Sequence, residues 1–256
     1  MQNEKTRVDF IYGRNNVLEA LDSDREIDKI LVAGDTAEGS LKRIVAKAVE
    51  NGIPVSYGAG KKIDALVSGG NAQGVLAFIA QKKYVSIDEI IAAAREKGEK
   101  PFIVIADEIA DPHNLGAIIR SADAFGAHGV IISKRRAAGL TASVEKASGG
   151  ALHYVPVAKV ANLASAIDRL KEDGLWIYGS DMDGETPYYE EKFDTALALV
   201  VGSEGKGMSR LIKEKCDFIV SIPMYGHVSC LNASVAAAVI MQEIAKYRNR
   251  GGSFHE

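Results

Sequence analysis

Three stretches in the C-terminal part of the chain place polar side chains where an apolar strand gives way to a helix. They are DPHNLGAIIRSADAFGAHGVI from Asp111, LALVVGSEGKGMS from Leu197 and SIPMYGHVSCLNASVAAAV from Ser221. The carboxyl ends of parallel strands are where α/β folds bind ligands. These stretches are therefore the first candidates for a functional site.

The first stretch predicts a helix that has Asn114 at its N-cap and ends at Gly126. Arg120 lies off the apolar face, in the early half of this helix. A cation there runs against the helix dipole, which predicts either an anionic ligand or a local partner. An ion pair with Asp123, three residues further on, is an equally good explanation on local grounds.

The second stretch is an apolar strand that breaks into the glycine-rich loop 202–207. Glycines let the backbone approach a ligand closely. The loop matches neither the Walker pattern nor G-x-G-x-x-G, so it is a weak sign of a site when taken alone. Glu204 has a simple alternative role as a cap for the helix predicted to begin near Met208.

The third stretch contains the strand FIVSIPM, a turn at Tyr225-Gly226, and then residues 229–234 leading into an alanine-rich helix. Asn232 or Ser234 could serve only as the N-cap of that helix. The small alanines suit tight helix packing or a subunit interface.

The elements around these stretches predict two α/β units. Residues 7–80 alternate helix-like and strand-like pieces, among them a helix over 40–51 that stops at Gly52. From Pro101 onward, apolar strands alternate with helices, which indicates a mostly parallel sheet covered on both faces. We therefore expect a domain at 1–81, a linker at 82–100 that holds a helix capped by Ser86, and a second domain at 101–256.

Composition excludes several classes of protein. No apolar run approaches the roughly 18 residues that span a bilayer, and the N-terminal MQNEKTRVDF has no secretory apolar region, so we expect a cytoplasmic protein without membrane contact. Cys216 and Cys230 are isolated and the histidines are scattered, which predicts neither a metal site nor a disulfide. A net charge of −3 argues against a generally basic surface but leaves room for local patches. The candidates are Lys42-Arg43, Lys61-Lys62, Lys82-Lys83 and Lys134-Arg135-Arg136.

Taken together and in order, the three stretches resemble the SpoU, or TrmH-type, branch of the SPOUT RNA 2′-O-methyltransferases. The matching patterns are N-x-x-x-x-x-R from Asn114, G-x-E-G from Gly202, and I-P-M from Ile222 followed by C-L-N-A-S from Cys230. The resemblance covers residues 101–250. Residues 7–80 are similar to the family's N-terminal RNA-binding domain, which has a ribosomal L30-like fold. The most similar group methylates a guanosine ribose in 23S ribosomal RNA.

This resemblance implies an α/β fold whose parallel-sheet domain is threaded as a deep trefoil knot, one of the rare exceptions to unknotted connections. It also implies a homodimer that uses S-adenosylmethionine without a metal. Backbone groups at Gly202, Ile222 and Leu231 would hold the cofactor, and structured RNA would be the partner.

The family's active-site positions fall on Asn114, Arg120, Glu204 and Asn232. Asn114 and Glu204 would orient Arg120 or the ribose, and Asn232 would position cofactor or substrate. Arg120 would act either as the general base, which is demanding for a guanidinium, or as a clamp for the adjacent phosphate and the developing oxyanion. The chain departs from the pattern at Cys230, where the family carries serine.

A second departure lies at residues 71–74, Asn-Ala-Gln-Gly, where relatives often have histidine before Gln-Gly. Several functions stay open beside the preferred one. The substrate could be a tRNA, or a ribosomal adenosine whose methylation confers antibiotic resistance. A non-catalytic RNA-binding or ribosome-assembly factor and a small-molecule enzyme with a nucleotide cofactor are the alternatives from other classes.

Overall fold

The computed structural model describes residues 10–23, 25–34, 39–67 and 71–248. Its contacts divide the chain into two compact units, one formed by the residues up to Lys83 with Gly139–Ser143, and the other by Tyr84–Ala138 and the chain from Val144 onward. The α/β class expected from the sequence is confirmed in both units. Within the described residues, no helix combines the length and the apolar character needed to span a membrane.

The first unit is a four-stranded sheet in the order β1-β4-β2-β3. Its strands are β1 (Phe10–Tyr12), β2 (Ile27–Ala33), β3 (Val55–Gly58) and β4 (Val75–Ile79). Strand β4 runs antiparallel to β1 and β2, while β3 runs parallel to β2. Strands β1, β2 and β3 therefore all end at the same edge of the sheet.

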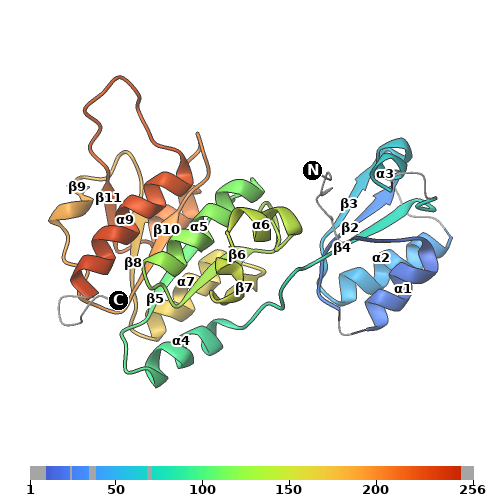
Figure 1. Ribbon diagram of the computed structural model, residues 1–256, viewed down its shortest axis with the longest axis horizontal. Helices are drawn as coiled ribbons and strands as arrows, with labels where there is room; N and C mark the ends of the chain where they lie inside the picture. Colours follow the sequence, from blue (N-terminus) through green and yellow to red (C-terminus); the bar gives the residue numbers. More distant parts are fainter. Residues whose placement is uncertain (1–9, 24, 35–38, 68–70, 249–256) are drawn as a thin grey trace, which may run out of the picture. The chain divides into compact units, whose positions relative to one another are not determined.

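Each of these three strands is followed by a helix: α1 (Arg14–Asp22), α2 (Ser40–Glu50) and α3 (Gly60–Leu66). Helices α1 and α2 lie side by side and share one core with the sheet (Figure 1). Helix α3 packs through Ile63 against a separate cluster around Leu76. The predicted helix over 40–51 is confirmed as α2, and Gly52 follows it with φ of 67°.

The second unit contains a seven-stranded sheet in the order β7-β6-β5-β10-β8-β11-β9, with every neighbouring pair parallel. The strands are β5 (Phe102–Ala106), β6 (Gly129–Ser133), β7 (Val157–Val160), β8 (Trp176–Ser180), β9 (Thr186–Pro187), β10 (Leu197–Val201) and β11 (Phe218–Ser221). Strands β5 and β10 are buried along their whole length. Burial on both faces explains their unbroken apolar sequence.

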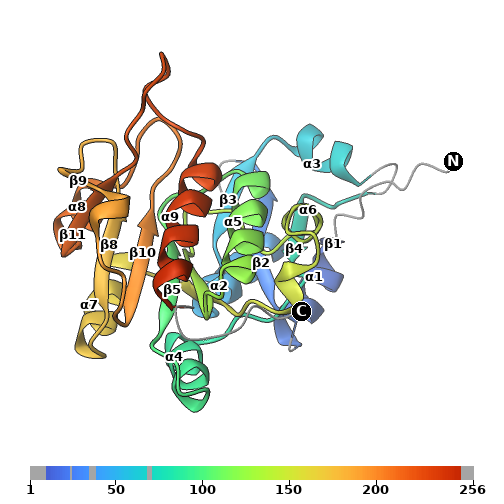
Figure 2. The ribbon, with the colours of Figure 1, turned by 60° about the vertical axis from the view of Figure 1, so that its left-hand side comes forward.

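The remaining helices are α4 (Ile87–Glu96), α5 (Pro112–Ala124), α6 (Ala142–Ala147), α7 (Leu163–Glu172), α8 (Arg210–Lys215) and α9 (Ala233–Arg248). All lie in the second unit except the first two residues of α6, which the contacts group with the first. Helices α5 and α9 pack against each other in front of the sheet (Figure 2). Helices α4, α7 and α8 contribute to the core on the other face. Ser86 is confirmed as the N-cap of α4, where it forms a capping box with Glu89.

Two predicted helix starts are wrong. The N-cap of α5 is Asp111, whose Oδ1 accepts from the backbone N–H of His113 at 3.0 Å, so Asn114 lies inside the helix. Pro112 explains the earlier start, because its fixed φ suits the first helical position. Helix α8 begins at Arg210 with Ser209 as its N-cap, later than the expected start near Met208.

Candidate active site

The glycine-rich segment after β10 is a closed loop. The backbone N–H of Ser203 donates to the carbonyl of Gly207 at 3.0 Å, and the N–H of Gly207 donates back to Ser203 at 2.9 Å. A Cβ at Gly202 would lie 2.1 Å from the carbonyl carbon of Gly207, so no larger residue fits there. Gly207 itself has φ of 65°, which side-chain-bearing residues rarely adopt. The loop thus has one defined shape.

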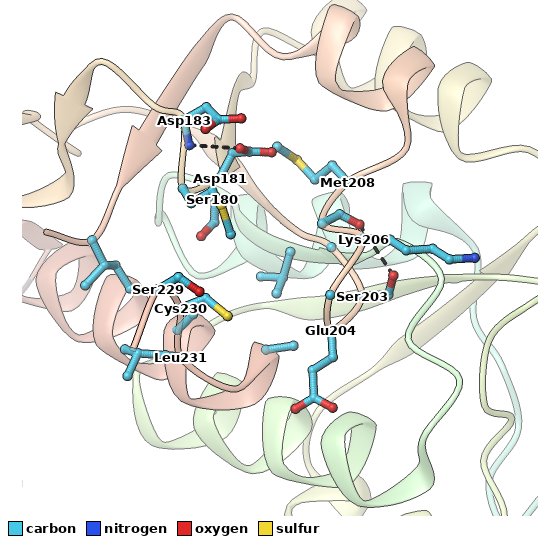
Figure 3. A pocket seen from close by; sticks show the side chains of 18 of the residues that line it. Ser180, Asp181, Asp183, Ser203, Glu204, Lys206, Met208, Ser229, Cys230 and Leu231 are labelled. Atoms are coloured by element: carbon cyan, nitrogen blue, oxygen red, sulfur yellow. Dashed lines mark hydrogen bonds between the residues drawn. The ribbon is translucent and has the colours of Figure 1, made fainter. Parts of the chain in front are cut away.

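This loop forms one wall of a cavity of about 430 Å³ at the carboxyl ends of β8, β10 and β11 (Figure 3). Ligand pockets usually measure about 300 to 1,000 Å³. The cavity walls include the three positions expected to hold a cofactor, Gly202, Ile222 and Leu231, together with Glu204 and Cys230. Parallel strands bring these separate segments together at one edge of the sheet.

The cavity has an apolar part and an acidic part. Ile222, Met224 and Leu231 line it with hydrocarbon. Asp181 and Asp183 line it just beyond the end of β8, and the Oδ1 of Asp181 accepts from the backbone N–H of Asp183 at 3.0 Å. Such a cavity suits a ligand with an apolar portion and hydrogen-bond donors.

Sequence reasoning missed Asp181 and Asp183. The signal was present in the chain, because the acidic run DMDGE directly follows the apolar strand LWIYGS. Lys213 compensates this acidity, since its Nζ lies 3.1 Å from an Asp181 carboxylate oxygen and 3.8 Å from one of Asp183.

A hydrogen-bonded cluster of Asn114, Glu204 and Asn232 lies beside the cavity. The Nδ2 of Asn232 donates to the Oδ1 of Asn114 at 2.9 Å and also donates to the Oε1 of Glu204. Figure 3 shows the Glu204 side chain extending from the loop in the direction of the helices below it. Three of the four predicted active-site positions therefore meet.

Asn232 also caps helix α9. Its Oδ1 accepts from the backbone N–H of Ser234 at 2.9 Å and of Val235 at 3.3 Å. The amide thus serves as helix cap through its oxygen and as bridge through its nitrogen. The alternative for Glu204, a cap on α8, is wrong: the N-cap of α8 is Ser209, this end of the helix has no side-chain capping hydrogen bond, and the Glu204 carboxylate accepts from Asn232.

Arg120 lies apart from this cluster. It is exposed on α5 and packs over Gly149, where a Cβ would come 3.6 Å from the guanidinium carbon. In the described part of the chain Arg120 has no hydrogen bond and no ion pair, so the pair with Asp123 that helical spacing allows is not formed. The guanidinium is therefore available to an anion.

The two cysteines have different surroundings. Cys230 is exposed and lines the cavity. Cys216 donates its Sγ–H to the carbonyl of Ile212 at 3.3 Å, and burial raises its pKa to about 12. Cys216 is thus a packing residue and not a nucleophile. Among the residues that the structure describes, no group of three or more His, Cys, Asp or Glu side chains could hold a metal ion.

An open parallel sheet with a mixed apolar and acidic cavity at its carboxyl edge defines an α/β protein that binds a small ligand. Comparisons with known families identify which one. Residues 101–242 match the SpoU rRNA Methylase family, and residues 10–85 match the RNA 2′-O ribose methyltransferase substrate binding family. The chain belongs to the SpoU family of RNA methyltransferases, as the three motifs indicated.

Known proteins match nearly the whole chain. YacO of Bacillus subtilis, named as a TrmH family tRNA/rRNA methyltransferase, is 48% identical over 244 residues, which are 95% of this chain and 98% of the relative. A protein of the same family name from Staphylococcus saprophyticus is 46% identical, covering 93% and 96%.

Solved structures agree. The SpoU methyltransferase AviRb from Streptomyces viridochromogenes, in complex with AdoMet, matches with a TM-score of 0.61 and 25% identity over 98% of this chain and 95% of its own. A TrmH/SpoU tRNA modifying enzyme of A. aeolicus matches with a TM-score of 0.53 and 30% identity, over 63% of this chain and 84% of its own. The predicted SPOUT-type fold is confirmed, and its trefoil knot stays a prediction.

Proposed function

We propose that this RNA methyltransferase transfers a methyl group from S-adenosylmethionine to the ribose 2′-oxygen of a guanosine in 23S ribosomal RNA. The observation that carries the proposal is the Asn114–Glu204–Asn232 cluster beside the cavity. Two amides and a carboxylate held by one another can orient a hydroxyl next to a bound cofactor. Such orientation is a large part of what a transfer between two bound groups requires.

The cavity fits S-adenosylmethionine in size and chemistry. Gly202, Ile222 and Leu231 bring backbone groups and hydrocarbon to its wall, where an adenine can lie. Asp181 and Asp183 supply acceptors for hydroxyl or ammonium groups. When bound, the cofactor would supply an electrophilic methyl group and leave as S-adenosylhomocysteine, and the proton of the ribose 2′-hydroxyl would pass to solvent water. AviRb, a structural neighbour, was solved with AdoMet, which supports the proposal.

We propose that Arg120 binds the phosphate next to the target ribose. A guanidinium stays protonated in proteins and presents a planar fork that matches a phosphate. Its exposure and its lack of a carboxylate partner in the described chain suit that role better than proton removal. In the transition state the same charge would stabilise the developing oxyanion.

The choice of ribosomal RNA rests on the N-terminal unit. The neighbour described as a tRNA modifying enzyme covers 63% of this chain, whereas AviRb covers 98%. An additional unit that matches a substrate-binding family suits a large structured RNA whose target loop must be held open. A substrate of this kind also places the enzyme in the cytoplasm.

The test is transfer of a tritiated methyl group to unmodified 23S ribosomal RNA and, separately, to unmodified tRNA, followed by nuclease mapping. Label on one 23S guanosine ribose is the expected result. Label on a ribose of tRNA alone would overturn the assignment of 23S ribosomal RNA as the substrate but would leave the assignment of 2′-O-methyl transfer standing. Folded, cofactor-bound protein that labels neither pool would favour the non-catalytic alternative.

Cofactor identity has its own assay. S-Adenosylhomocysteine at one hundred times its Kd should add about 2.7 kcal/mol to the free energy of unfolding, while NAD and ATP should not shift it. Stabilisation by NAD or ATP alone would point to the small-molecule alternative.

We also propose that the enzyme is a homodimer. Several segments that contribute to the cavity wall also carry exposed apolar side chains: Tyr225 is 90% exposed, Met182 and Val228 are each 62% exposed, and Val235 is 47% exposed. Exposed apolar side chains of this kind suit contact with a second copy of the chain. Light scattering should report a dimer, and Tyr225→Asp should shift it toward monomer; a monomeric parent protein would overturn the proposal.

A further inference from the structure

The N-terminal unit carries five cations at one edge of its sheet. We name them the cationic edge: Arg14, Lys42, Arg43, Lys61 and Lys62. Arg14 is the first residue of α1, Lys42 and Arg43 lie in the first turn of α2, and Lys61 and Lys62 in that of α3. Because β1, β2 and β3 point the same way, all three helices begin at this edge.

No carboxylate in the described chain pairs with any residue of the cationic edge. The opposite edge differs, because α1 ends in Asp22, α2 ends in Glu50, and Lys47 forms an ion pair with Asp22. Among the described residues, cations therefore pair with carboxylates at the opposite edge and not at the cationic edge. A surface with unpaired cations of this kind attracts polyanions.

Arg14 is held in place by two segments distant in sequence. Its Nε donates to the carbonyl of Gln73 at 3.0 Å, and its Nη1 donates to the Oγ of Ser40 at 2.9 Å. The side chain of Gln73 in turn accepts from the backbone N–H of Arg14 at 3.1 Å. Within the described residues, Nη2 has no partner. The guanidinium is thus fixed and keeps free donors.

The turn that holds Arg14 is itself unusual. Gln73 has φ of 51°, a conformation that residues other than glycine rarely adopt. Its backbone N–H donates to the Oδ1 of Asn71 at 2.8 Å, which stabilises the turn. This turn is the Asn-Ala-Gln-Gly segment of residues 71–74. Its structural role is to present the Gln73 carbonyl to Arg14.

We propose that the cationic edge, with Arg14 as its fixed member, binds the phosphodiester backbone of the substrate RNA. This proposal rests on the RNA methyltransferase function given above and adds the surface that receives the RNA. A prepositioned guanidinium offers a phosphate two parallel donors with little further loss of side-chain freedom. The four surrounding cations add attraction that is independent of sequence and sensitive to salt.

The experiment measures binding of the full-length protein to an unmodified 23S rRNA transcript as a function of salt, together with steady-state methyl transfer. The variants are Arg14→Ala and the double variant Lys61→Ala/Lys62→Ala. Arg25→Ala is the matched control, because it removes one exposed charge at the opposite edge. Thermal unfolding identifies any variant that fails to fold. The lysine variant breaks no hydrogen bond in the described chain, so it tests the cationic edge even if Arg14→Ala does not fold.

Arg14→Ala should raise the Kd for RNA about tenfold at 0.1 M salt. The slope of the logarithm of the binding constant against the logarithm of salt concentration should fall in magnitude by about one for Arg14→Ala and by about two for the lysine variant. KM for RNA should rise while kcat at saturating RNA stays near that of the parent. The control should match the parent protein. If the parent methylates RNA and both edge variants bind like the control, this proposal alone is overturned; a parent that neither binds nor methylates RNA overturns both proposals.

Discussion

Replacing Asn232 by aspartate separates the two roles of this side chain. The oxygen that caps α9 is retained, because aspartate is as good an N-cap as asparagine. The Nδ2 donors to Asn114 and Glu204 are lost, and a carboxylate takes their place. Asn232→Asp should therefore leave the helix intact and disrupt the cluster.

The magnitude follows from the contacts. Two hydrogen bonds at about 1 kcal/mol each contribute about 2 kcal/mol. Repulsion between two carboxylates about 4 Å apart adds about 1 kcal/mol at the high dielectric appropriate to the exposed Glu204. If the sum of about 3 kcal/mol falls on orientation of the reacting groups, kcat should drop about 10²-fold.

Single-turnover methyl transfer and thermal unfolding measure the two effects separately. Asn232→Ser is the matched control, since serine keeps an N-cap oxygen and introduces no charge. We expect the activation free energy of methyl transfer to rise by about 2 kcal/mol in the serine variant, from the two lost hydrogen bonds, and by more in the aspartate variant. An aspartate variant with parent-like kcat would refute the view that the Asn232 amide orients the site.

Three further predictions concern other sites. Arg120→Lys keeps the charge and loses the planar fork, so methyl transfer should fall at least about tenfold; a near-parental rate would show that bidentate binding is not needed. Cys230→Ser restores the family residue beside the cavity and should be active in the same assay, whereas an inactive variant would contradict the alignment at this position. His128 accepts from the backbone N–H of Phe102 through Nδ1 at 3.0 Å and bonds Glu99 through Nε2 at 2.9 Å, and burial lowers its pKa. Below about pH 6.5 the unfolded chain therefore binds a proton at His128 more readily than the folded chain does, and the free energy of unfolding should fall as pH drops through that value. Denaturant unfolding at a series of pH values measures this, and His128→Gln should reduce the pH dependence. An unchanged pH dependence in the variant would exclude His128 as its source.

Helix ends were predicted correctly where a single residue type decides where the helix begins or stops. The apolar spacing over 40–51 and the glycine after it predicted α2, and Ser86 with Glu89 three residues later produced the capping box of α4. The start of α5 was misplaced because Asp111 and Asn114 are both good caps, and the local pattern at Asn114 does not show that Pro112 shifts the start. Neighbouring candidates of equal propensity are separated only by the folded backbone.

The chain by itself determined the family and the α/β class, and it predicted the glycine loop and the positions Asn114, Glu204 and Asn232, because each depends on residue types over short spacings. The acidic wall of Asp181 and Asp183 was found only in the folded structure. The folded structure also decided which of the predicted residues meet. Asn114 and Asn232 are 118 positions apart and share a hydrogen bond because α5 and α9 pack together, and Glu204 joins them because β10 lies beside β5. Strand order also opened the cavity and placed Arg14 between Ser40 and Gln73. Such contacts follow from how distant segments bury their apolar faces together, and that packing is a property of the whole sheet.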